Sequence, residues 1–159
     1  MKRKIPVLLA TLALAGLGAA TPVTAAQAAP DKSVAAAPCD DDYQNARRGF
    51  FYAYEHANCR TLLGHTDIND SNWGNGQGAF NGRDTNRASS LLNKGRLMEV
   101  AVYNATGTDW GGGMACLARS EKYASNLNNN TFHNQVAIND GISSHRWVTA
   151  GQCNGHWAD

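Results

Sequence analysis

The sequence predicts an all-β, disulfide-stabilised sandwich built from two similar halves. Short aromatic and β-branched runs alternate with turns rich in Gly and Asn, as in antiparallel sheets. A polar motif that ends in Ser-Ser occurs twice, at residues 85–90 and 139–144, which indicates two related supersecondary units. The chain also has 4 cysteines, an even number that suits a small exported protein with two bridges.

The first residues have the pattern of a signal peptide. Basic residues at positions 2–4 precede an apolar stretch that is too short and weak to span a membrane, and residues 26–28 form a small-residue cleavage site. We therefore expect residues 1–28 to be removed and the product to be extracellular. Residues 29–48 are expected to form a flexible, solvated lead-in, with one helical turn as the alternative, and residues 49–159 one domain.

Charge argues against several classes of partner. The formal net charge of the whole chain is +1, and the first 28 residues carry three positive charges and no negative ones, so the product is near −2. Such a surface does not suit nucleic acid, which requires a basic face. No cluster of Lys and Arg remains in the sequence after cleavage, so we expect no electrostatic attachment to a membrane. We expect a monomer.

The cysteines of the exported chain are expected to form disulfides, and four cysteines allow three connectivities. We favour Cys39–Cys59 together with Cys116–Cys153, because each bridge then stays within one half of the molecule. Metal ligation is the alternative, but it requires close Cys-x-x-Cys spacing, which the sequence lacks.

Strands are expected at four places along the chain. Residues 50–54 form an aromatic run of high β-propensity, and residues 100–103 mark a second strand. Residues 136–138 alternate between apolar and polar types, as a half-buried strand does, and residues 147–149 are expected to form the final strand. Residues 87–98 carry leucines at positions also compatible with a helix, and we interpret them as a loop followed by a strand.

The repeated motif and the strands before it resemble the βγ-crystallin Greek key over most of residues 50–149. The residues that carry the resemblance in the two halves are Tyr54, Ser89, Tyr103, Trp110, Gly112 and Ser143. The first half departs from the family pattern, because Cys59 stands where an aromatic residue is usual and Thr61 stands near the expected Gly. The resemblance implies a sandwich of two Greek keys, in which the Ser hydroxyl ties down a folded hairpin.

The resemblance also implies a function. In size, export and cysteine count the chain is similar to the secreted bacterial branch of the family, which includes metalloproteinase inhibitors. The leading expectation is therefore a secreted inhibitor-like protein that binds an extracellular metalloprotease. A calcium-binding module with a structural or stress role is the second expectation, a secreted antimicrobial toxin the third, and a glycan-binding or lytic protein the fourth. Trp73 is the candidate for an exposed partner contact, unless it folds back on the core.

Microbial members of the family bind calcium through an Asn/Asp-Asn/Asp-x-x-Ser/Thr-Ser motif in each half, with ligands exchanged across the pair. The resemblance therefore makes the matching positions candidate calcium ligands. These are Asn86, Ser89, Asn139, Asp140 and Ser143. Oxygen donors of these kinds suit a hard cation. In the first motif, Thr85 replaces an acid or amide, and Arg87 brings a positive charge that opposes cation binding.

The sequence lacks the usual catalytic patterns. There is no His-Glu-x-x-His and no Gly-x-Ser-x-Gly, and bridged cysteines provide no thiol nucleophile. Glu55 and Asp67 are two carboxylates of the kind a glycosidase uses, but no spacing selects them as a pair. We therefore expect no enzymatic activity and no required cofactor, with calcium as the candidate ion.

Overall fold

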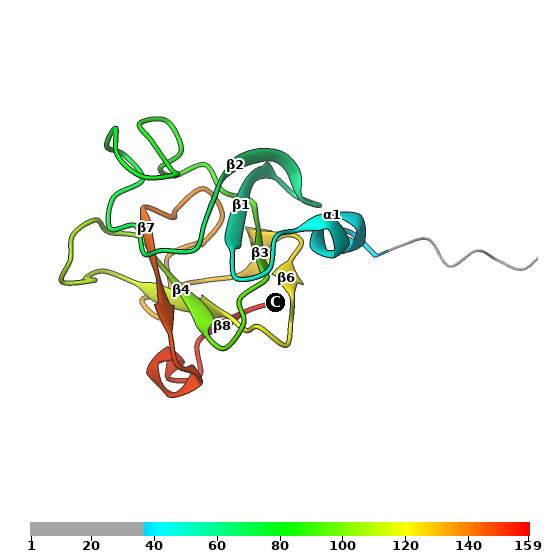
Figure 1. Ribbon diagram of the computed structural model, residues 1–159. Helices are drawn as coiled ribbons and strands as arrows, with labels where there is room; N and C mark the ends of the chain where they lie inside the picture. Colours follow the sequence, from blue (N-terminus) through cyan, green and yellow to red (C-terminus); the bar gives the residue numbers. More distant parts are fainter. Residues whose placement is uncertain (1–36) are drawn as a thin grey trace, which may run out of the picture. The chain divides into compact units, whose positions relative to one another are not determined.

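The computed structural model describes residues 37–159, which contain two four-stranded sheets (Figure 1). The strand order is β2-β1-β3-β6 in one sheet and β7-β4-β5-β8 in the other. The elements are α1 (Asp40–Asn45), β1 (Phe51–His56), β2 (Arg60–Thr66), β3 (Ser90–Asn93), β4 (Glu99–Tyr103), β5 (Met114–Leu117), β6 (Tyr123–Ala124), η1 (Leu127–Asn129), β7 (Ser144–Val148), η2 (Ala150–Cys153) and β8 (Trp157–Ala158). The prediction of an all-β fold with two sheets is confirmed.

Each half builds its sheet in the same way and gives one segment to the other half. β1 pairs with β2 and β3, and β4 pairs with β5 and β7, all antiparallel. β6 follows β5 in the chain but pairs with β3 of the first half. Asp70, which lies between β2 and β3, pairs with His145 of β7. The two halves are therefore interlocked around one core.

Alternation along the central strands sorts the side chains between two faces. In β1, Phe51 and Ala53 join the core cluster shared by both sheets, whereas Tyr52 and Tyr54 pack on the outer side. β4 alternates in the same way, with Val100 and Val102 in the shared core and its remaining buried side chains in a separate cluster. This arrangement places one core between the sheets and a smaller cluster on each outer face.

One disulfide belongs to each outer cluster. Cys39–Cys59 packs in the cluster that contains Tyr52 and Tyr54, and Cys116–Cys153 packs in the cluster that contains Tyr103. The favoured connectivity is confirmed. The bridges close loops of 20 and 37 residues. By restricting the unfolded chain, each contributes about 3–4 kcal/mol to stability.

The lead-in contains a helix where the sequence favoured a solvated segment. Three Asp residues occupy the first turn of α1, where negative charge is favourable. The helix is held by the Tyr123 hydroxyl, which donates to the Asp40 carboxylate at 2.8 Å, and by the Lys94 ammonium, which donates to the Tyr43 carbonyl at 2.6 Å. The expected signal peptide and the first part of the lead-in lie outside the described residues.

The expectation of a strand at residues 136–138 is wrong. Gln135 adopts a left-handed conformation with φ of 66°, so the chain turns back on itself, and the Phe132 amide donates to the Val136 carbonyl at 2.8 Å. Ile138 is fully buried nevertheless. The expected strand at 147–149 overlaps β7, and the last strand is β8. Within residues 37–159, no helix has the length and apolar character needed to cross a membrane.

Candidate functional site

The two Ser-Ser motifs lie against each other and exchange side-chain contacts. The Ser89 hydroxyl of the first motif donates to the Asp140 carboxylate of the second at 3.4 Å. The Ser143 hydroxyl of the second motif donates to the Asn86 side-chain carbonyl of the first at 3.0 Å. The second position of each motif therefore meets the fifth position of the other. Four of the five candidate calcium ligands are brought together in this way.

The backbone repeats the exchange. The Asn86 amide donates to the Ile142 carbonyl at 2.8 Å, and the Asp140 amide donates to the Ala88 carbonyl at 3.0 Å. Asn86 and Asp140 both have positive φ, 58° and 53°, a conformation that Asn and Asp tolerate better than most residues. The requirement for a short polar residue at this position is thus partly conformational.

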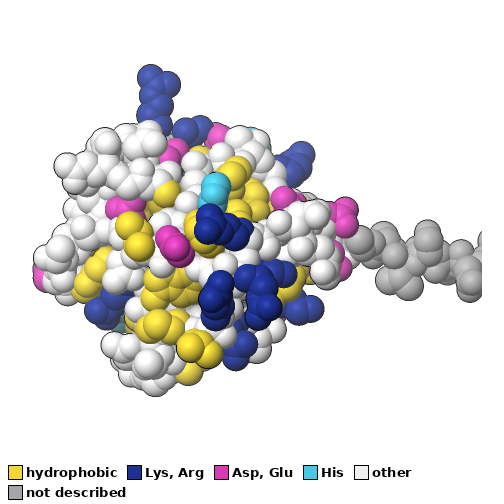
Figure 2. Space-filling model, viewed as in Figure 1, with side chains coloured by type: hydrophobic (Ala, Val, Ile, Leu, Met, Phe, Trp, Pro, Cys, Tyr) yellow, Lys and Arg dark blue, Asp and Glu magenta, His cyan; other side chains and the backbone are white. Residues whose placement is uncertain are grey.

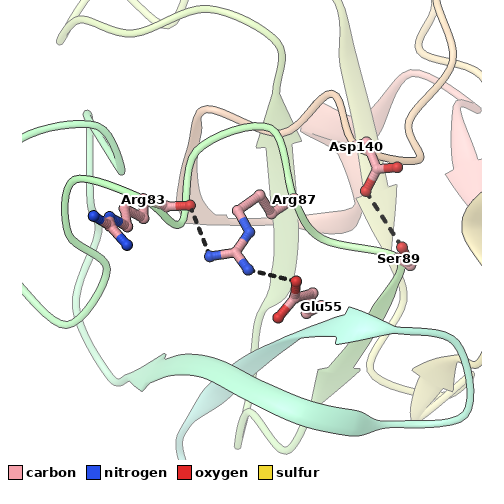
Figure 3. A network of polar contacts seen from close by, with 5 residues as sticks. All are labelled: Glu55, Arg83, Arg87, Ser89 and Asp140. Carbon is pink, nitrogen blue, oxygen red and sulfur yellow. Dashed lines mark hydrogen bonds and ion pairs between the residues drawn. The ribbon is translucent and has the colours of Figure 1, made fainter.

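Arg87 places its guanidinium beside the first of these pairs. It forms an ion pair with the Glu55 carboxylate and donates to the Arg83 carbonyl at 3.3 Å, as Figure 3 shows. A hollow of about 370 Å³ opens here. It is lined by Glu55, His56, Asn86, Arg87, Ser89 and Asp140. The guanidinium therefore supplies positive charge at the place where a cation would be expected.

The oxygen atoms near the Ser89–Asp140 pair are of the types that a hard cation binds. Glu55 and Asp140 offer carboxylates and Ser89 a hydroxyl, while the Asn139 side-chain carbonyl is buried without a partner. The Asn139 amide already donates to the Asp140 carboxylate at 2.9 Å. Among residues 37–159, no three His, Cys, Asp or Glu side chains form a group able to hold a metal. Calcium would therefore need amide, hydroxyl and carbonyl oxygens in addition to these two carboxylates, and would compete with Arg87.

The second serine of each motif, rather than the first, ties down the hairpin. The Ser90 hydroxyl donates to the His56 carbonyl at 2.7 Å and accepts the Cys59 amide at 3.1 Å. The Ser144 hydroxyl donates to the Ala105 carbonyl at 2.6 Å. The hairpin role that the resemblance implied for Ser143 thus belongs to its neighbour. The first serines are left for the exchange between motifs.

Trp73 does not form an exposed contact, so that expectation is wrong. Its side chain is 0% exposed and stacks on Phe80 with ring centroids 4.1 Å apart. Its indole Nε1–H donates to Nδ1 of His145 at 2.9 Å. Trp73 therefore belongs to the core, as the alternative interpretation had it.

His145 is fully buried beside Trp73 and is held in one tautomer. Because Nδ1 accepts the indole N–H, Nε2 carries the proton and faces the Ile68 carbonyl at 3.1 Å. Burial lowers the pKa of His145 to about 3, although the Ile68 carbonyl opposes the shift. The ring is therefore neutral at ordinary pH, and its role is to join the two halves.

The loop of residues 94–98, between β3 and β4, was not among the sites predicted from the sequence. Leu97 in this loop is 88% exposed, the largest value among the exposed large hydrophobic residues described. The preceding Asn93 is fully buried and pins the loop: its side-chain carbonyl accepts the Gly95 amide at 2.8 Å. Its side-chain amide donates to the carbonyls of Met98 at 3.4 Å and Leu117 at 3.1 Å. The sequence feature that could have indicated a pinned loop is an Asn at the end of an apolar strand, followed by Lys-Gly.

Gly95 is required in this loop because neighbours approach it closely. A Cβ atom there would lie 2.6 Å from the Trp147 ring, 2.7 Å from the Asn93 side-chain carbonyl and 3.0 Å from the Met98 carbonyl. The loop backbone is thus held between a buried amide on one side and an indole ring on the other. Loop 94–98 is a rigid element that carries two large exposed apolar side chains, Leu97 at 88% and Met98 at 37% exposed.

No family model and no curated protein matches this chain. A solved structure from work on the evolution of the eye lens beta-gamma-crystallin domain fold is similar to it, with a TM-score of 0.48 and 20% sequence identity. The match covers 66% of this chain and 90% of the other. At this level the likeness concerns the course of the chain and says nothing of function.

Proposed function

We propose that the protein is an exported proteinase inhibitor, directed at a metalloprotease, and that loop 94–98 enters the protease cleft. The observation that carries the proposal is Leu97, which is 88% exposed in a loop pinned by a buried side chain. A large apolar side chain held out to solvent on a rigid loop is suited to act as the anchor of an interface. The metalloprotease class comes from the family resemblance alone, and export from the N-terminal pattern together with two disulfides.

Rigidity supports this assignment. The loop's first residue is bonded through its backbone to the neighbouring chain: the Lys94 amide donates to the Phe50 carbonyl at 3.0 Å, and the Lys94 carbonyl accepts the Gly49 amide at 2.8 Å. Asn93 holds both ends of the loop from inside. A loop that is already ordered loses little conformational entropy on binding, which favours tight association. Its hydrogen bonds also oppose the distortion of the backbone that cleavage by the protease would require.

The test is a titration of a thermolysin-type metalloprotease with the processed protein, disulfides intact. We expect activity to fall linearly to an equivalence point. Leu97→Ala should weaken inhibition roughly 30-fold, as expected for an interface hot spot. The matched control is Val136→Ala, another exposed apolar residue, which should inhibit like the parent protein.

Two results would contradict the proposal. One is full protease activity at molar excess of the protein, with the protein itself uncleaved. The other is inhibition that Leu97→Ala leaves unchanged, which would place the contact elsewhere.

A second candidate function, calcium binding, is favoured by the exchange of side chains between the two motifs. Asp140 with Ser89, and Asn86 with Ser143, place oxygen donors from both halves together. Thermal melts with calcium and with chelator provide the test, since a ligand at a hundredfold over its Kd adds about 2.7 kcal/mol to stability. Superimposed melting curves would reject calcium binding.

A further inference from the structure

Five positively charged side chains from three separate segments meet at loop 94–98, which supplies two of them. The basic patch consists of Arg47, Arg48, Lys94, Arg96 and Lys122. The segments are bonded to one another: the Gly49 amide donates to the Lys94 carbonyl at 2.8 Å, and the Asn93 amide donates to the Lys122 carbonyl at 2.7 Å. Figure 2 shows Lys and Arg side chains gathered on this face. No cluster of this kind was expected from the sequence, because no single run of residues contains all five positive charges.

Aromatic rings position three of these cations. The Arg47 guanidinium lies 4.4 Å from the centroid of the Phe50 ring. The Lys94 and Lys122 ammonium groups lie 3.6 Å and 5.7 Å from the centroid of the Tyr43 ring. Contacts of this type orient a cation while leaving its charge in place.

No member of the basic patch forms an ion pair with a carboxylate of the described residues. Among residues 37–159 the one ion pair within 4.0 Å joins Arg87 to Glu55, and neither belongs to the patch. Burial lowers the pKa of Lys94, and the charges of Arg48 and Lys122 lower it further. Asp67 is the carboxylate that shares a hollow of about 240 Å³ with Arg96 and Leu97.

We propose that the basic patch and Leu97 form one interface, which binds a partner protein that carries carboxylates around an apolar socket. This inference rests on the proposed function, because it names the charge that the rim of the target cleft should have. An apolar anchor with a group of cations beside it suits a protein interface, in which a hot spot is bordered by a polar rim. The rim charges would steer the partner to the loop and raise the association rate.

A carboxylate within the same surface favours a protein partner over a continuous polyanion or a lipid surface. Three of the five patch members are Arg, whose planar fork can bind the carboxylates of such a partner in a bidentate manner. Asp67 lies beside Arg96 in the same hollow and would repel an unbroken anionic surface. A partner with discrete carboxylates can place them over the cations and leave Asp67 apart.

The first test uses hexaglutamate as the probe and needs no protease. Backbone amide shifts should change at the basic patch and loop 94–98, and the changes should disappear at high salt. The double variant Arg48→Gln/Arg96→Gln should weaken binding roughly tenfold. The matched control Arg60→Gln/Arg83→Gln removes the same charge from exposed sites outside the patch and should bind like the parent protein. Chemical-shift changes spread evenly over all the arginines would overturn the proposal. Binding to anionic lipid vesicles that is lost on removal of Leu97 or the basic patch would also overturn it, because the partner would then be a lipid surface.

The second test measures the association rate of the inhibited protease. The Arg48→Gln/Arg96→Gln variant should associate roughly tenfold more slowly at low salt, while the control double variant should not. If neither the parent protein nor any variant inhibits the protease, the proposed function is contradicted. The hexaglutamate experiment then decides by itself whether the basic patch binds carboxylates. Equal association rates for both double variants, together with no localised hexaglutamate shifts, overturn the patch while the inhibitor assignment stands.

Discussion

Asp70 and His145 exchange both of their backbone hydrogen bonds, at 3.0 and 2.9 Å, although they belong to opposite halves of the chain. The pair marks the point where a segment of the first half joins the sheet of the second. Both side chains are partly or wholly removed from water: burial raises the pKa of Asp70, against the amides of Asn72 and Phe80, and lowers that of His145. We therefore expect the stability of this junction to depend on pH.

Acid should destabilise the protein through His145. Its pKa falls from 6.5 to about 3 on folding, so its contribution to stability is full above pH 6.5 and is lost as pH falls towards 3. Between pH 7.5 and 5 the free energy of unfolding should drop by about 2 kcal/mol from this group alone. Urea unfolding at the two pH values measures the change.

Two comparisons isolate the histidine. His145→Gln should be less stable at pH 7.5 but should lose this part of the pH dependence, whereas His156→Gln, an exposed control, should keep it. Asp70 acts in the opposite direction, since its raised pKa makes the native state bind protons more readily at the acid end. An unchanged slope in His145→Gln would show that the ring does not control acid stability.

Trp73→Phe should be destabilised beyond the loss of ring area. The substitution keeps an aromatic ring on Phe80 but removes the indole donor, which leaves Nδ1 of His145 buried without a partner. The expected cost is about 1–3 kcal/mol in the free energy of unfolding. Trp157→Phe, at a side chain 41% exposed, is the control, and equal denaturation midpoints for the two variants would refute the role of the bond.

The sequence predicted what depends on local patterns. Aromatic and β-branched runs correctly located β1 and β4, because alternation along a strand directly reflects burial on two faces. The Ser-Ser repeat correctly indicated two related halves, and the cysteine spacing favoured the observed bridges. In each case a few neighbouring residues carry the structural information.

Features that depend on contacts between distant segments could not be predicted from the sequence. Residues 136–138 alternate like a strand, but a left-handed Gln135 folds them into a turn. Trp73 lies in a Gly- and Asn-rich loop, yet His145 provides it with a buried partner. The basic patch draws its members from three segments, so neither net charge nor any window of sequence reveals it. These contacts exist only because the two halves interlock.

Arg87→Gln should increase calcium affinity if the motif pair binds calcium. The substitution removes the guanidinium that occupies Glu55 and so releases a carboxylate next to Asp140 and Ser89. Removing one positive charge from the site should tighten calcium binding roughly tenfold. Arg83→Gln is the control, because Figure 3 shows its side chain pointing away from Glu55. Isothermal titration compares the calcium dissociation constants of the three forms, and equal constants for both variants would exclude competition by Arg87.

Asn93→Asp should loosen loop 94–98 while leaving its shape nearly unchanged. The carboxylate still accepts the Gly95 amide, but it loses the two donors and turns an oxygen towards the carbonyls of Met98 and Leu117. Because the site is fully buried, the free energy of unfolding should fall by about 3 kcal/mol at neutral pH.

The control for this variant is Asn129→Asp, which makes the same chemical change at an exposed position and should cost little stability. Denaturant midpoints for the two variants, followed by protease titration at a temperature where both are folded, separate loop rigidity from global stability. If Asn93→Asp inhibits the protease as strongly as the parent protein, the rigidity of loop 94–98 is not required for recognition by the target.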